Sequence, residues 1–154
     1  MDLIAGDQRE IVLALAIEDM AGLADRDRFA AHLSLGAGLD PTWLDAFSEA
    51  VRDTTGLLDP MDFLDARTEV EGTGTMTERI VERVDPAWVA AVAAVGDEQL
   101  GAIAGRWIAL LEEDQGARLP REDKPWIRDL AANVVGFCRA AAEARAMVIF
   151  AWGF

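Results

Sequence analysis

The sequence of 154 residues is poor in the side chains that build metal and redox sites. It has a single cysteine, Cys138, which excludes a disulfide framework. It has a single histidine, His32, which excludes a metal site of several histidines. Its single lysine, Lys124, precedes a proline and follows no glycine loop, so a phosphate-binding loop of the Gly-x-x-x-x-Gly-Lys type is absent. We therefore predict that the chain holds no metal and no cofactor.

Two glycine pairs fail the dinucleotide-binding pattern. Gly72 and Gly74 would need a glycine or alanine at position 77, where a threonine stands. Gly36 and Gly38 would need one at position 41, which is a proline. The acids Asp59, Asp62 and Asp65 carry oxygen ligands at regular spacing, but they lack the pattern of a calcium loop. We interpret them as acids around a helix start.

Long apolar runs are also missing. The first apolar run covers residues 11–17 and is bounded by Glu10 and Glu18, far short of the roughly 18 residues that a membrane span needs. A secretory signal would start with basic residues and carry a longer apolar stretch. The sequence therefore predicts a cytoplasmic protein without membrane contact, and its preference for alanine and for arginine over lysine indicates a bacterial source.

Positive charge is scarce. The chain has 28 acidic and 14 basic side chains, a formal net charge of −14, which argues against a nucleic-acid partner. Residues 1–77 carry a net charge of −11, and residues 78–154 carry only −3. A strongly negative surface keeps chains apart in solution. The alternative interpretation is that the acidic first half binds a basic protein partner.

The apolar content of 52% is enough for a core, and we predict one globular domain over residues 1–154. Asp-Pro pairs at residues 40–41, 59–60 and 85–86 indicate three helix starts, because aspartate caps free amides and proline suits the first helical position. Gly56 and Gly116 are typical helix ends.

Apolar spacing of three and four residues predicts three further helices. The first covers residues 7–24, with a short helical turn continuing through residues 25–33. The second starts at Asp97, and the third starts at Pro125. Their predicted buried stripes are Leu13, Ile17, Met20 and Ala24; Leu100, Ile103, Trp107, Leu110 and Leu111; and Ile127, Leu130, Val134, Phe137 and Ala141.

Two segments favour strands over helices. Residues 66–84 have threonine and valine around a glycine pair, which favours a hairpin. A helix over residues 76–84 is the alternative, because Thr75 and Glu78 form a capping-box pattern. Residues 147–154 carry no charge and must be buried. We predict a helix-dominated α+β fold of five or six helices, with a small antiparallel sheet from residues 66–84 and the C-terminal run and with helices over one face. An all-α bundle is the alternative.

Candidate functional residues are few. Cys138 and His32 are interpreted as structural, and Arg106 beside Trp107 is the candidate binding pair, since tryptophan and arginine are enriched at binding surfaces. The function we predict is a non-catalytic protein that binds or regulates another protein. The alternatives are a small-molecule-binding protein or enzyme with carboxylates in a tryptophan-lined pocket, and a homo-oligomer joined through the C-terminal run.

Overall fold

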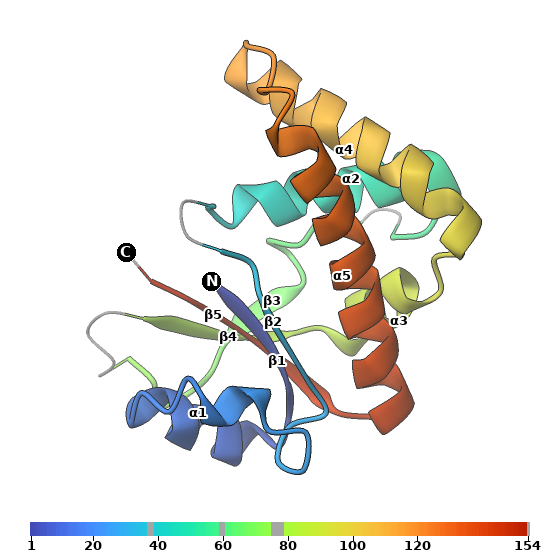
Figure 1. Ribbon diagram of the computed structural model, residues 1–154. Helices are drawn as coiled ribbons and strands as arrows, with labels where there is room; N and C mark the ends of the chain where they lie inside the picture. The colour runs from blue at the N-terminus through green and yellow to red at the C-terminus, as the bar shows by residue number, and fades with distance from the viewer. Residues whose placement is uncertain (37–38, 59–60, 75–78, 154) are drawn as a thin grey trace.

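The centre of the molecule is a five-stranded antiparallel sheet (Figure 1). The computed structural model describes residues 1–36, 39–58, 61–74 and 79–153. The strands are β1 (Asp2–Gly6), β2 (Ala31–Ser34), β3 (Arg67–Glu69), β4 (Ile80–Val84) and β5 (Met147–Trp152), in the order β2-β1-β5-β4-β3. The α-helices are α1 (Gln8–Ala16), α2 (Thr42–Thr55), α3 (Pro86–Ala93), α4 (Leu100–Gln115) and α5 (Asp123–Ala144).

The C-terminal strand β5 lies in the middle of the sheet. Its residue Ile149 stands opposite Ile4 of β1 on one side and Arg83 of β4 on the other. The predicted α+β fold is thereby confirmed, and the all-α alternative is wrong. The strand over residues 80–84 also overrides the helical alternative there, although the capping-box pattern of Thr75 and Glu78 lies outside the described residues.

Strands β1 and β2 are absent from the sequence-based prediction. Residues 25–33 were expected to form a helical turn, whereas Ala31–Ser34 pairs antiparallel with β1. Both strands are short and have no turn signal of the hairpin type between them. Strand β1 buries the consecutive residues Leu3, Ile4 and Ala5 between the layers on the two faces of the sheet. This burial depends on segments far away in the sequence, so local spacing does not predict it.

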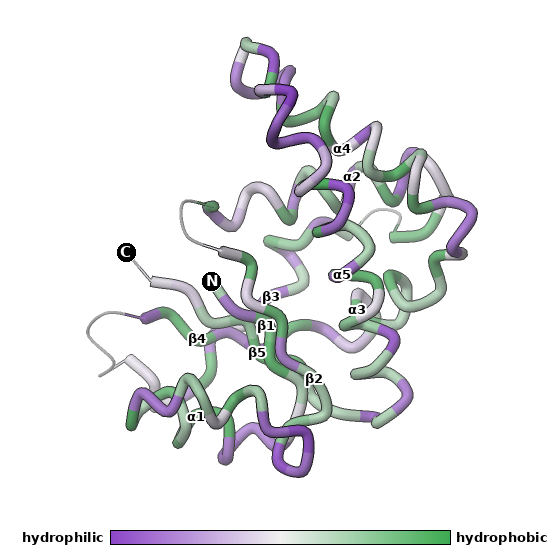
Figure 2. The backbone as a smooth tube through the Cα atoms, viewed as in Figure 1, coloured by the Kyte–Doolittle hydropathy of each residue, from purple (hydrophilic) through white to green (hydrophobic). Residues whose placement is uncertain are grey.

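Helices cover both faces of the sheet, which corrects the expectation of one covered face. Helices α2 to α5 lie over one face and α1 lies over the other (Figure 1). Because successive strand residues point to opposite faces, Val148 and Phe150 join the core under α2 to α5, and Ile149 and Ala151 join the core under α1. The hydropathy colouring shows β1 and β5 as apolar in the middle of these layers (Figure 2).

The first helix is shorter than predicted, and another of its faces is buried. It ends at Ala16, and its buried residues are Ile11, Ala14 and Leu15. Leu13 and Ile17, taken as core from their spacing, are 52% and 63% exposed. Both sets follow helical spacing, so the choice between them depends on where the sheet lies, and that is decided outside the helix.

The helix-start signals are confirmed where they are described. The Asp40 carboxylate accepts a hydrogen bond from the Thr42 amide at 2.8 Å, and the Asp85 carboxylate accepts one from the Ala87 amide at 2.7 Å. Residues 59–60 of the third Asp-Pro pair lie outside the described part, and residues 63–66 form a turn. Asp97 does not cap α4, because a 3-10 turn intervenes and its carboxylate pairs with Arg139 at 2.7 Å.

The other helix features agree with the sequence. Gly56 and Gly116 end α2 and α4 with φ of +72° and +62°, the left-handed conformation that glycine adopts without strain. The stripe predicted on α5 is buried, and so is that on α4 from Ile103 onward. Burial raises the pKa of the Cys138 thiol, in keeping with its interpretation as a core residue.

His32 makes a structural hydrogen bond to Asp2. Its Nε2 lies 2.9 Å from Oδ1 of Asp2, and the two side chains are mostly covered. Burial works to raise the pKa of Asp2, but the hydrogen bond from His32 and the N-terminal ammonium group outweigh it, so the pKa is lowered. A carboxylate with a lowered pKa in the folded state stabilises the fold above its unfolded pKa of about 4, and this contribution is lost as the pH falls through the folded value.

Asp2→Asn should therefore lower the free energy of unfolding by about 1 kcal/mol at neutral pH. The difference from the parent protein should shrink below about pH 4 and vanish once Asp2 is protonated in both states. Urea unfolding across this pH range measures it, with Asp27→Asn at an exposed position as the control. A difference that does not change with pH would contradict the assignment.

Candidate functional site

An acidic groove runs between α2 and α4. Its volume is about 470 Å³, within the range of ligand-binding clefts. Five carboxylates line it, and the remaining lining is a threonine and apolar side chains. The lining residues are Asp45, Glu49, Asp62, Glu113 and Asp114, with Thr42, Ala46, Leu110 and Leu111. We refer to this feature as the acidic groove.

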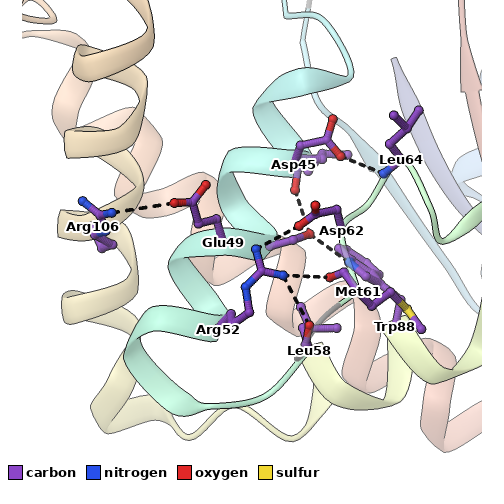
Figure 3. Close-up of polar contacts among 11 residues, drawn as sticks. Asp45, Glu49, Arg52, Leu58, Met61, Asp62, Leu64, Trp88 and Arg106 are labelled. Carbon is purple, nitrogen blue, oxygen red and sulfur yellow. Dashed lines mark hydrogen bonds and ion pairs between the residues drawn. The ribbon is translucent and has the colours of Figure 1, made fainter.

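Helix α2 presents its charged face to the groove because its other face is core. Leu44, Phe47 and Val51 are buried. The spacing of four residues then places Asp45 and Glu49 together on the opposite side, next to Arg52 (Figure 3). The packing of α2 on the sheet and on α4 thus aims a row of carboxylates outward.

Arg52 holds the chain that follows α2 against the helix. Its Nη2 lies 2.9 Å from an oxygen of Asp62, and its Nη1 donates to the carbonyl oxygens of Leu58 and Met61, each at 3.5 Å (Figure 3). One guanidinium group therefore fixes three residues of this segment. It places the Asp62 carboxylate at the edge of the groove.

Asp45 lies where this segment meets α2. Its carboxylate accepts a hydrogen bond from the Leu64 amide at 2.7 Å (Figure 3). Burial raises the pKa of Asp45, and the negative charges of Asp62 and Asp65 raise it further against the opposing effects of the Leu64 amide and Arg67. The site thus holds carboxylates close enough to repel one another, and a cation placed between them would relieve that repulsion.

Arg106 of α4 lies next to the groove and pairs with two of the acids that line it. Its guanidinium group reaches Asp53 at 2.8 Å, Glu113 at 3.4 Å and Glu49 at 3.8 Å. The five carboxylates of the groove and that of Asp53 together contribute six negative charges to this region. The guanidinium groups of Arg52 and Arg106 contribute two positive charges, so a net charge of about −4 remains. The groove is therefore suited to bind ammonium or guanidinium groups.

The structure places the predicted pair Arg106 and Trp107 in different surroundings, since neighbouring residues of a helix point about 100° apart. Arg106 contacts the groove acids. Trp107 is fully buried, and its indole Nε1 donates to the carbonyl oxygen of Trp43 at 2.9 Å. Its ring also packs edge-on against Phe47 at 5.1 Å between centroids. Trp107 thus supports the groove by fixing α4 to α2.

The sequence analysis did not find Asp45, Glu49, Glu113 and Asp114 as a group. The two pairs lie on different helices and are more than 60 positions apart in the sequence, and each helix alone shows only an ordinary charged face. The sequence analysis considered Asp62 together with Asp59 and Asp65. In the structure Asp62 pairs with Arg52, and Asp59 lies outside the described residues. Among the described residues, no group of three or more His, Cys, Asp or Glu side chains is arranged to hold a metal ion.

Comparisons with known proteins found no matching family model, no matching curated protein and no matching solved structure. A membrane-crossing helix is also not found among the helices described here. The function must therefore be argued from the groove.

Proposed function

We propose that this protein is a non-catalytic, cytoplasmic binding protein that holds a basic segment of a partner protein in the acidic groove. The observation that carries the proposal is the set of five carboxylates that line one groove between two helices. Their charge exceeds that of the two arginines that contact them. An arginine or lysine of the partner would neutralise part of the remaining negative charge in the groove.

The character of the groove favours binding over catalysis. Its lining consists of carboxylates, one threonine and apolar residues, and the carboxylate of Asp45, whose pKa burial raises, is engaged by the Leu64 amide. General acid–base chemistry needs a proton-transfer group that is free to reach a substrate. The apolar floor from Leu110 and Leu111 would instead cover the aliphatic stem of a lysine or arginine.

A labelled octa-arginine peptide provides the test, with binding followed by fluorescence anisotropy at two salt concentrations. The paired variant Glu49→Gln/Asp114→Asn removes two charges from the groove. The control Glu71→Gln/Glu98→Gln removes two exposed charges elsewhere and changes the net charge equally. We expect the groove variant to weaken binding about tenfold and the control less than about twofold.

The salt dependence of binding distinguishes binding in the acidic groove from general attraction of the peptide to an acidic protein. Raising sodium chloride from about 50 to about 300 mM should weaken parent binding and reduce the difference between the two variants. Equal losses in both variants would show that the peptide senses net charge alone, and the proposal would be abandoned.

A further inference from the structure

A second groove, of opposite character, lies where α3 and α5 meet the ends of β4 and β5. Its volume is about 640 Å³. Nine of its eleven lining residues are uncharged and mostly apolar, and both charged ones are arginines, Arg83 and Arg145. A groove with only positive charge is unexpected in a chain whose acids outnumber its bases two to one. We refer to it as the arginine groove.

Neither arginine is neutralised within the part of the chain that the structure describes. No ion pair joins Arg83 or Arg145 to an acid there, in contrast to Arg52 and Arg106. The carboxylate of Asp85, close to Arg83 in sequence, is occupied as the cap of α3. Arg83 also lines a smaller groove together with Glu69 and Glu71, whose carboxylates compete with a ligand for its charge. Arg145 is therefore the more available of the two arginines.

Arg145 occupies an unusual backbone position. It ends α5 with φ of +51°, the left-handed conformation in which α2 and α4 have glycines. A side chain with a Cβ is strained there, whereas glycine is not. Arg145 is exposed and lines an apolar groove, so a strained backbone conformation and a charged side chain coincide where a ligand could bind.

From these features we infer that the arginine groove binds a small apolar monocarboxylate. The apolar residues Pro86, Ala90 and Met147, which are exposed in the lining of the groove, would cover its hydrocarbon part. Guanidinium groups pair with carboxylates through two parallel hydrogen bonds, so Arg145, with Arg83, would hold the acid group. A single negative charge suits the site better than a phosphate dianion, because the whole molecule carries a formal charge of −14.

Decanoate is the probe, measured by isothermal titration calorimetry below the concentration at which it forms micelles. Saturable binding is expected, with decanol and decylamine at least about tenfold weaker. Amide chemical-shift changes should concentrate at Ala90, Ala142 and Ala146 of the groove. No saturable binding, equal binding of decanol or decylamine, shifts centred elsewhere, or tighter binding of decyl phosphate would each overturn the inference.

Arg145→Gly separates ligand binding from folding. Glycine relieves the left-handed strain, so thermal stability should be unchanged or higher, while affinity for decanoate should fall about tenfold. Arg83→Gln should also weaken binding. Arg128→Gln removes the same charge from an exposed position near the start of α5 and should leave the affinity unchanged. Unchanged binding in Arg145→Gly, or an equal loss in Arg128→Gln, would contradict the site.

Discussion

Phe150→Ala should lower the free energy of unfolding by about 3–5 kcal/mol, a large part of the 5–15 kcal/mol that is typical of a domain. Phe150 is fully buried in the central strand, with its ring edge-on to Phe63 at 5.1 Å between centroids. Its removal leaves a cavity between the sheet and the helix layer, and the strands paired on both sides of β5 restrict how far the site can collapse.

Thermal or urea unfolding measures this effect, and the midpoint temperature should fall by roughly 10 °C. Met147→Ala is the matched control, because Met147 stands at the exposed start of the same strand. It should cost less than about 1 kcal/mol. Similar losses in the two variants would mean that the interior position of β5 is wrong.

Arg67→Met should cost about 3–5 kcal/mol, because it leaves a largely buried carboxylate without its cation. The Arg67 side chain is only 5% exposed, and its Nη1 lies 2.7 Å from Oε2 of Glu82. The guanidinium carbon is also 5.1 Å from the centre of the Phe63 ring and 5.4 Å from that of Phe150. The same oxygen of Glu82 accepts a hydrogen bond from Trp152 Nε1 at 2.9 Å.

A double variant distinguishes the unpaired charge from simple loss of packing. Arg67→Met combined with Glu82→Gln keeps an oxygen acceptor for Trp152 but removes the charge. It should be more stable than Arg67→Met alone by about 2 kcal/mol. The exposed Arg128→Met serves as the control and should change stability by less than about 0.5 kcal/mol. A double variant that is less stable than the single one would refute the explanation.

How well a part of the fold can be predicted depends on whether the interactions that form it join residues close together in the sequence. The starts of α2 and α3 follow from Asp40 and Asp85, because an aspartate cap acts on amides two residues away. The stripe of α5 could be derived because a long helix repeats its pattern several times. In α1, nine residues allow more than one apolar stripe, and the local sequence favoured Leu13 and Ile17.

The candidate site was less predictable than the fold. Arg106 could be proposed from its neighbour Trp107, but the reason it matters is its contact with Asp53 and Glu49 on another helix. The arginine groove likewise joins Arg83 and Arg145, which are 62 positions apart. Charge pairs of this kind depend on helix packing, and they leave no spacing signal in the chain.

Composition and local pattern were sufficient for the excess of acid, the lack of a disulfide, most helix ends and the burial of residues 148–151 in the uncharged C-terminal run, whereas Met147 is exposed. Each of these depends on contacts within a few residues or on a simple count. The pairing of β1 with β5, the side on which α1 packs and the two oppositely charged grooves arise only when distant segments meet. The physical reason is that apolar burial and charge proximity depend on distance in space, which chain order does not specify for segments far apart in sequence.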